Sequence, residues 1–391
     1  MTEAVYGVDL VAWQLKIARG ESLPLSQEAI DERLSGHAIE ARIYAEDPAQ
    51  NFMPQAGPVL LWQPPSGEGV RVDAGVGSEV SSAYDPMVAK IIAHGPTRET
   101  ARRRLLKALD DLLFFGPNHN TAFLKGLLEE PVFIDGSAHT RSIDETLQPA
   151  ERQLPQPWLQ ALAAVLLSAQ PKASSGLIDG WGSTQRGHWP VRLELDLDGF
   201  NASSPEAANE TAQCWQVTQL ASDRFRAMLS ADPLGLAGHA GDEPLSYEFD
   251  HVELDNDTHT CRFTLDGVNQ RRGALLERSQ GQAQRVCLLS PEGHQLRFSD
   301  TTYTLAAAQG SEEADHRVRA PMSAKVVKVL CEQGQQVAHG DTLLILEAMK
   351  LEHRILAPMD GVIAELTAKE GDQVSPKQQL VELAASADST A

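Results

Sequence analysis

The sequence lacks the features that would place it in a membrane, in an oxidising compartment or on nucleic acid. No apolar run in its 391 residues approaches the roughly 20 needed to span a bilayer. Only 33 basic residues stand against 54 acidic ones, and the formal net charge of −21 repels phosphate backbones and anionic lipids. No signal peptide is evident, and no C-x-x-C pair occurs among the cysteines, which are Cys214, Cys261, Cys287 and Cys331. We therefore predict a cytoplasmic chain with reduced cysteines and with neither nucleic acid nor membrane as a partner.

The length and composition of the chain favour several globular domains. A chain of 391 residues is too long for a single hydrophobic core, and its 42% hydrophobic content is ordinary for a globular protein. We expect roughly two to four domains. Helical and strand-like patterns both occur, so the predicted class is a multidomain α+β protein.

Residues 1 to about 145 combine helices with short strands. Apolar residues at helical spacing predict one helix over Val8–Arg19 and another over Thr97–Phe115. Ala38–Tyr44 and Val70–Ala74 are predicted strands. The basic triplet Arg102–Arg104 lies between the apolar positions of the second helix, and we expect it to form a solvated face.

Residues 150–308 have a different pattern. A predicted apolar helix over Trp158–Ala169 is closed by Pro171 and precedes about eight short strands, with Asp198-Gly199 and Asp266-Gly267 as turn signals. This pattern predicts a β-barrel or a sandwich. The strand candidates include Val191–Asp196, Trp215–Leu220, Phe225–Leu229, Tyr247–Leu254, Cys261–Leu265 and Gln284–Leu289. The polar stretch Gln309–Asp315 that follows is a predicted flexible tether.

The last part of the chain contains an internal repeat. Ala320–Leu346 aligns without gaps with Ala357–Leu383, at an offset of 37 residues. Identical pairs, such as Gly334 with Gly371, fall at turn and apolar positions. Because each half is one supersecondary unit that buries a single face, we predict that the two halves pack as a two-fold related sandwich.

The segment that links the two halves contains Glu347-Ala348-Met349-Lys350. A tight turn exposes its central side chain, so we expect Lys350 to project into solvent from a rigid scaffold, where a modifying enzyme could reach it. An ordinary surface lysine is the plain alternative. The position of Lys350 at the centre of a repeat argues against that alternative.

A duplicated sandwich with Ala-Met-Lys at its central turn resembles the biotin carboxyl carrier domain of biotin-dependent carboxylases. The resemblance implies that Lys350 takes covalently attached biotin, and that Ala348 and Met349 contribute to recognition by a biotin protein ligase. Leu351 stands where many members have methionine, so an apolar residue is kept. The rival interpretation is the related lipoyl domain, which usually carries Asp-Lys-Ala.

Two earlier segments, Gly36–Pro48 and Tyr84–Gly95, resemble the carboxyl-terminal part of biotin carboxylase. The resemblance gives Arg42 the role of stabilising the biotin enolate during carboxyl transfer. A guanidinium suits this role because it stays charged and offers fixed donors to a developing oxyanion. Without the resemblance, an arginine on a strand is more often a surface ion-pair residue. We find no Gly-rich phosphate loop, no lysine pair for ATP and no Glu-x-Asn-x-Arg magnesium motif, so we expect the chain to begin inside this domain, without its ATP-binding half.

The middle region resembles the connecting domain of acyl-CoA carboxylase α-subunits, where a barrel encloses a helix and docks the carboxyltransferase β-subunit. A barrel without a partner is the alternative. The order of these parts predicts an amino-terminally truncated, biotin-bearing α-subunit. Its domains are an incomplete lobe of an ATP-grasp biotin carboxylase (1–145), a connecting barrel (150–308), a linker (309–317) and an all-β biotinyl/lipoyl-type sandwich (318–386).

The complete enzyme implied by this resemblance is a hetero-oligomer that carries carboxybiotin from a site using ATP, bicarbonate and Mg²⁺ to the carboxyltransferase β-subunit. The segment Glu347–His353 looks most like the 3-methylcrotonyl-CoA branch. Geranyl-CoA, propionyl-CoA and acetyl-CoA stay open, because the acyl chain binds the other subunit. Taken alone, the chain is alternatively a non-catalytic biotin carrier and docking module, and we expect no metal site in it.

Overall fold

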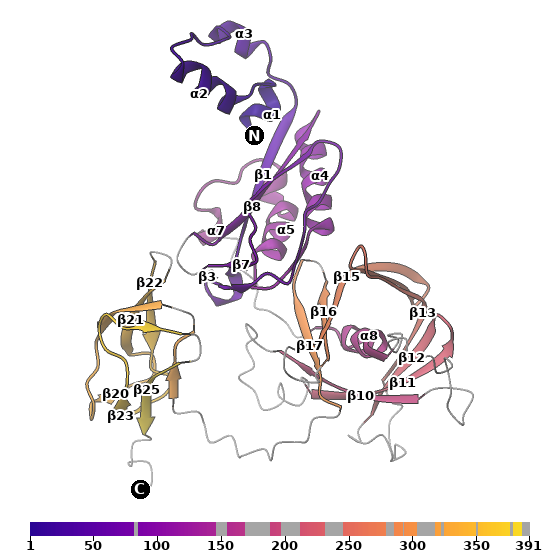
Figure 1. Ribbon diagram of the computed structural model, residues 1–391, viewed down its shortest axis with the longest axis vertical. Helices are drawn as coiled ribbons and strands as arrows, with labels where there is room; N and C mark the ends of the chain where they lie inside the picture. The colour runs from indigo at the N-terminus through magenta and orange to yellow at the C-terminus, as the bar shows by residue number, and fades with distance from the viewer. Residues whose placement is uncertain are drawn as a thin grey trace. The chain divides into compact units, whose positions relative to one another are not determined.

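The computed structural model of the protein describes residues 1–81, 85–145, 155–168, 188–196, 212–230, 245–278, 285–291, 293–302, 317–321, 324–348, 351–375 and 378–384. They belong to two units, Met1–Ser137 with Ala306–Ala391, and Ala138–Leu305. The predicted tether Gln309–Asp315, the Asp198-Gly199 turn and Lys350 lie outside the described residues. Figure 1 shows the folded parts as an α+β part, a barrel and a small sandwich.

Residues 1–145 form helices and mostly short strands. The helix expected over Val8–Arg19 is present as α2, and the carboxylate of Asp9 caps it by accepting the Ala12 N–H at 2.9 Å. The elements are α1 (Thr2–Tyr6), α2 (Leu10–Ala18), α3 (Gln27–Asp31), β1 (His37–Tyr44), β2 (Glu46–Asp47), η1 (Pro48–Gln50), β3 (Met53–Pro54), β4 (Gly57–Pro58), β5 (Leu61–Gln63), β6 (Val70–Ala74), β7 (Glu79–Val80), β8 (Met87–Gly95), α4 (Arg98–Asp111), β9 (Leu113–Phe115), α5 (Thr121–Glu129), α6 (Pro131–Ile134) and α7 (Ser142–Glu145).

An antiparallel sheet with the strand order β1-β8-β6 is the centre of this part, and it contains both predicted strands. Side chains alternate between the two faces of a strand. Ala41, Ile43 and Ile91 lie on the face that is buried, in one apolar cluster with Leu105 and Leu109 of α4. The opposite face carries charged side chains, so burial against α4 decides which residues meet solvent.

The helix predicted over Thr97–Phe115 is wrong at its carboxyl end. Helix α4 ends at Asp111, Leu112 has an extended backbone, and Leu113–Phe115 forms strand β9, which pairs with β5. All three β9 residues are buried, and Phe114 packs edge-on against Trp62 at 5.5 Å between ring centroids. Pairing with β5 and burial of all three side chains therefore override the helical spacing of the leucines.

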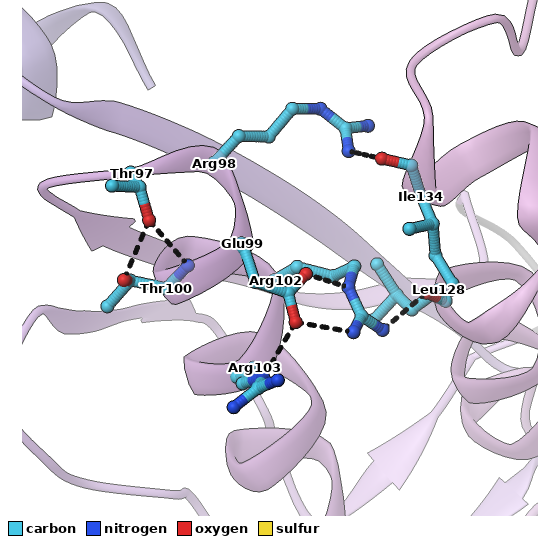
Figure 2. A network of polar contacts seen from close by, with 8 residues as sticks. All are labelled: Thr97, Arg98, Glu99, Thr100, Arg102, Arg103, Leu128 and Ile134. Atoms are coloured by element: carbon cyan, nitrogen blue, oxygen red, sulfur yellow. Dashed lines mark hydrogen bonds and ion pairs between the residues drawn. The ribbon is translucent and has the colours of Figure 1, made fainter.

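The expected solvated face over Arg102–Arg104 is wrong for two of the three arginines, as Figure 2 shows for the first. The Arg102 side chain is only 11% exposed; it binds Glu99 and donates from Nη1 to the Leu128 carbonyl at 2.9 Å. Arg104 donates to the His94 carbonyl at 2.8 Å, whereas Arg103 is 76% exposed. Arg102 thus satisfies a carbonyl at the end of α5 that the helix itself leaves without a donor.

Eight strands close into a barrel around helix α8 (Pro157–Ser168), so the barrel is confirmed over the sandwich (Figure 1). Each strand pairs antiparallel with the next, and β10 pairs with β17. Residues 159–167 of α8 are all buried, which an all-round apolar helix requires. The strands are β10 (His188–Leu195), β11 (Ala212–Ala221), β12 (Arg224–Ser230), β13 (Ser246–Asp255), β14 (Thr260–Leu265), β15 (Val268–Arg278), β16 (Arg285–Ser290) and β17 (Leu296–Asp300).

Arg285 ties the carboxyl end of α8 to the barrel wall. Its Nη1 donates to the Leu167 carbonyl at 2.6 Å, and its Nη2 lies 2.6 Å from Oδ2 of Asp300. The Asp300 side chain is 5% exposed. A cation at this end also balances the negative end of the helix dipole. One side chain therefore holds both the helix and a nearly buried carboxylate.

The carboxyl-terminal part is a sandwich of two four-stranded sheets, with the orders β18-β25-β23-β20 and β22-β21-β19-β24. A shift of 37 residues takes one sheet onto the other, as the repeat predicts. The strands are β18 (Arg317–Arg319), β19 (Ala324–Val329), β20 (Gln336–Val337), β21 (Thr342–Ala348), β22 (Leu351–Leu356), β23 (Gly361–Leu366), β24 (Gln373–Val374) and β25 (Gln379–Ala384).

We expect Arg285→Met to destabilise the barrel by about 2–3 kcal/mol, because Asp300 then stays nearly buried without its cation and the Leu167 carbonyl loses its donor. Native-state hydrogen exchange of barrel peptides measures this loss. Arg226→Met, which breaks an exposed ion pair with Glu248 on the same barrel, is the matched control and should cost under about 1 kcal/mol. Equal losses in the two variants would contradict the assignment.

Candidate functional site

The two halves of the sandwich are joined by hydrogen bonds that repeat under the 37-residue shift. The Gly334 N–H donates to the Ile363 carbonyl at 2.8 Å, and the Gly371 N–H donates to the Val326 carbonyl at the same distance. The Val326 N–H reaches the Asp372 carbonyl at 2.9 Å, and the Ile363 N–H reaches the Gln335 carbonyl at 2.9 Å. Each half therefore donates hydrogen bonds to carbonyls of the other at equivalent positions, which confirms the predicted two-fold packing.

The hairpin of β21 and β22 lies between the two halves. Its register pairs Leu346 with His353, Glu347 with Glu352 and Ala348 with Leu351. The pairing leaves Met349 and Lys350 as the two residues between the paired positions, and both lie outside the described residues. Biotin attachment at Lys350, and the contribution of Ala348 and Met349 to ligase recognition, stay predictions.

The hairpin stands on a closely packed core. Leu343, Leu344 and Leu346 of β21 are fully buried, and Ile355 of β22 is 8% exposed. On the other face, register places Lys325 of β19 opposite Glu347. The strands that precede and follow Met349-Lys350 in the sequence are thus held by core packing.

His353 is the titratable side chain of this hairpin that faces the core. It lies opposite buried Leu346, and its Nε2 atom is buried and has no hydrogen-bond partner among the described residues. Burial lowers the pKa of His353 below its ordinary value of 6.5. The folded sandwich therefore favours the neutral imidazole.

This burial predicts a pH dependence of sandwich stability. Between the lowered pKa and 6.5, the unfolded chain binds a proton that the folded chain does not. Stability therefore falls as the pH drops below the unfolded value, by at most about 1.4 kcal/mol per pH unit and less for a partly exposed group.

Hydrogen exchange of β21–β22 peptides from about pH 5 to about pH 8 measures the effect. His353→Gln should remove this component of the pH dependence and keep the rest, which comes from carboxylates. The same pH profile in parent and variant would contradict the role given to His353.

Arg42 lies on the solvent-facing side of the sheet β1-β8-β6. Its Nε is 3.0 Å from Oε1 of Glu40, and its side chain is 59% exposed. The hydrogen bonds that the Arg42 guanidinium donates to Glu40, and then to Tyr44, raise its pKa above the ordinary value, so it stays a cation at every working pH. The contact with Glu40 is the surface ion pair named as an alternative, and the exposure also leaves room for an anion.

Lys90 and Asp73 extend this charged face across the sheet. Register places Lys90 of β8 opposite Arg42, and Asp73 of β6 opposite Lys90. The Lys90 Nζ is 3.6 Å from Asp73 Oδ2, while Arg71 Nε is 2.8 Å from Asp73 Oδ1. Glu40 and Asp73 thus balance two neighbouring cations from opposite sides. Two adjacent cations suit recognition of a small anion such as a carboxylate.

Sequence reasoning does not identify Lys90 and Asp73. Lys90 lies inside Tyr84–Gly95, but its place in an apolar run carries no sign of a site. Strand register alone brings it beside Arg42. Polar residues recur at even spacing in Val70–Ala74 and in Met87–Gly95, as on one face of a strand. Aligning these positions between the two segments would place Asp73 beside Lys90, in the row that contains Arg42.

The other acidic residues near this strand have structural roles. Asp47 is fully buried, and its carboxylate accepts the Ala49 N–H at 3.0 Å and Nδ2 of Asn118 at 3.3 Å. Burial, with a smaller contribution from Asp85, raises the pKa of Glu46. Within the described ranges, no three His, Cys, Asp or Glu side chains gather as a metal site requires.

Two further findings concern the cysteines and the helices. All four cysteines are buried and without a disulfide, and burial raises the pKa of the Cys261 thiol to about 12. Thiolate chemistry is therefore unfavourable there. In the part of the chain that the structure describes, every helix is too short or too polar to span a bilayer.

Comparison with known proteins gives two family matches. Residues 40–145 match the family described as biotin carboxylase C-terminal domain, and residues 316–383 match the family described as biotin-requiring enzyme. The chain carries both of these domains. The mostly β fold is therefore the carboxyl-terminal lobe of a biotin carboxylase, related to ATP-grasp enzymes, with an eight-stranded barrel around a helix and a biotinyl/lipoyl-type sandwich.

The relatives of this chain include carboxylase α subunits that are named for different acyl-CoA substrates. Methylcrotonoyl-CoA carboxylase subunit alpha of Mus musculus is 30% identical in an alignment of 358 positions that covers 90% of this chain and 47% of the relative. The propionyl-CoA carboxylase alpha chain of Ruegeria pomeroyi is 30% identical in an alignment of 393 positions that covers 90% of this chain and 52% of the relative. The solved biotin carboxylase subunit of a pyruvate carboxylase is 37% identical, covers 38% of this chain and 34% of that chain, and has a TM-score of 0.36. The chain spans about half the length of the curated relatives it matches.

The sandwich fits the group that its family requires. The hairpin β21–β22 has a buried core beneath it and only two residues between its paired ends, of which one is a lysine. A lysine amine is a nucleophile that can form an amide with an activated carboxyl group such as that of the biotin side chain. The match to the biotin-requiring family makes biotin the cofactor of this sandwich.

Proposed function

We propose that this chain is the biotin-bearing α-subunit, or part of it, of a biotin-dependent acyl-CoA carboxylase. Lys350 attaches biotin, which carries the carboxyl group between two sites. The observation that supports this most is the two-fold sandwich, whose central hairpin leaves only Met349 and Lys350 between its paired ends. The attachment residue therefore follows closely in sequence on a strand whose leucines are fully buried.

The role of Arg42 follows from its position. It is an exposed cation beside Lys90 on one sheet face, with Glu40 setting the direction of its side chain. Its guanidinium donates hydrogen bonds to an oxyanion that develops during carboxyl transfer. Because Glu40 already accepts from Nε, the terminal nitrogens are the donors that face an incoming anion.

We propose 3-methylcrotonyl-CoA as the acyl acceptor, on the sequence Glu347–His353 and on the methylcrotonoyl-CoA carboxylase relatives. Equal identity to a propionyl-CoA carboxylase keeps that substrate as the second choice. The barrel docks the carboxyltransferase β-subunit, and a biotin protein ligase modifies the sandwich. The exposed charges of Arg224, Arg226 and Glu248 on the outer barrel wall offer polar contacts for such a partner.

A second candidate function is a carrier and docking module without ATP-dependent chemistry. The observation that favours it is that none of the ATP-binding motifs occurs in this sequence. Helix α2 favours the first candidate instead, because it has no buried residue although its exposed side chains include Leu10, Val11, Leu15 and Ile17, and an apolar helix of this kind is normally covered. We infer that an ATP-binding lobe covers it in a complete carboxylase.

Coexpression with a biotin ligase should add the mass of one biotinyl group to the chain, as measured by intact-mass spectrometry. Lys350→Arg keeps the charge but removes the amine nucleophile, so it should abolish the addition. Lys325→Arg and Lys328→Arg change lysines on the neighbouring strand β19 and should leave it complete. Addition that survives in Lys350→Arg would place the modification elsewhere, and a lipoyl adduct in place of biotin would favour the rival carrier.

Titration of the chain with MgATP tests whether it holds a nucleotide site of its own, which a carrier and docking module lacks. We expect no binding heat, because none of the ATP-binding motifs occurs in this sequence. If the chain takes covalent biotin but does not bind ATP, it behaves as the carrier part of a carboxylase. Saturable binding with a dissociation constant below about 1 mM would show that the chain holds a nucleotide site that its sequence conceals.

A further inference from the structure

Asn120 contacts the strand that carries Arg42 through three hydrogen bonds. Its Oδ1 accepts the Tyr44 N–H at 3.0 Å, and its Nδ2 donates to the Arg42 carbonyl at 3.2 Å. Its own N–H donates to the Tyr44 carbonyl at 3.1 Å. Asn120 is 6% exposed, so these bonds are shielded from water. It stands at the N-cap of α5, yet its side chain makes no cap bond and serves β1 instead.

The contact falls where β1 is least supported. In the sheet β1-β8-β6, β1 is an edge strand, so its outward N–H and C=O groups lack a neighbouring strand. The register with β8 also shifts between Ile43 and Tyr44, and such a bulge breaks the ladder and redirects side chains. Asn120 binds Arg42 on one side of the shift and Tyr44 on the other. One side chain therefore replaces a partner strand at the irregular point.

The loop that holds Asn120 is itself fixed. The His119 ring lies 2.8 Å from the Thr121 hydroxyl through Nδ1 and 3.2 Å from the Phe114 carbonyl through Nε2. The same ring stacks on Phe114 at 4.9 Å between centroids. His119 and Thr121 are 9% and 1% exposed. Asn120 is thus presented to β1 from a buried support.

We propose that Asn120 is a positioning residue for Arg42. By fixing the Arg42 carbonyl and the Tyr44 N–H, its amide sets the backbone from which Arg42 and Tyr44 extend on one face of the strand. Glu40, Arg42 and Tyr44 share that face, and the contact between Arg42 and Glu40 depends on it. We call these two bonds of the Asn120 side chain, to the Arg42 carbonyl and the Tyr44 N–H, the clamp. The clamp needs one acceptor and one donor, which an asparagine amide offers together. The inference rests on the proposed role of Arg42.

The chemistry of the clamp is tested by Asn120→Asp in the full chain. An aspartate keeps the acceptor for the Tyr44 N–H but turns a carboxylate oxygen toward the Arg42 carbonyl. With ¹⁵N-labelled arginine, the Arg42 Nε–Hε signal, assigned by its loss in Arg42→Lys, reports the side chain directly. Hydrogen exchange of the Tyr44 amide reports the backbone. We expect the Arg42 signal to shift and the Tyr44 amide to exchange about ten-fold faster or more.

Thr121→Val is the matched control, because it removes the hydroxyl that binds His119 in the same loop and leaves Asn120 in place. It should lower the melting temperature while the Arg42 signal stays where it is. If Asn120→Asp does not fold, Asn120→Ser, whose hydroxyl is too short to span both groups, should shift the Arg42 signal in the same way.

An unchanged Arg42 signal in the folded Asn120 variant, or the same shift in Thr121→Val, would overturn the inference. Biotin addition at Lys350 is measured separately and does not involve Asn120. Failure of that addition would count against the proposed function, whereas failure of the nuclear magnetic resonance test would count against the clamp alone.

Discussion

A β-strand presents two faces, and in each folded part of this protein one face must be buried by something other than the strand itself. The cover differs in each case. Helix α4 covers the sheet β1-β8-β6, helix α8 fills the barrel, and in the sandwich each repeat covers the other. Arg42, which the proposed function needs, lies on the sheet face that α4 leaves uncovered. Lys350 stands in the sequence between the paired ends of the β21–β22 hairpin.

Each cation on the open face of β1-β8-β6 lies close to a carboxylate. Glu40 accepts from Arg42, and Asp73 accepts from Arg71 and lies near Lys90. Exposed pairs of this kind contribute little to stability, because solvent screens the attraction between the charges. Their effect is to orient side chains, because each carboxylate holds a cation that would otherwise sample many rotamers. By contrast, the arginines that stabilise the fold, Arg102 and Arg285, bind carbonyls at helix ends.

The same residue types therefore have different roles according to what the fold places next to them. Arg102 and Arg103 are sequence neighbours in one helix, yet one is nearly buried against α5 and the other is largely in solvent. Leu113, Phe114 and Phe115 continue the helical spacing of α4, yet they form a strand, because β5 offers a partner and the surrounding core buries them. Local pattern cannot distinguish these outcomes, since each depends on a segment far away in the chain.

The sequence by itself determined the features that repeat or that alternate locally. The 37-residue duplication, the apolar helix with about eight strands after it, and the strands Ala38–Tyr44 and Val70–Ala74 all follow from spacing, which a single chain displays. Resemblance marked Lys350 and Arg42. Only the tertiary structure decided which cations share a face with Arg42, and that Asn120, 78 positions away, holds its backbone. Strand register and loop contacts join residues distant in sequence, and packing energy, which no local pattern records, selects among the possible pairings.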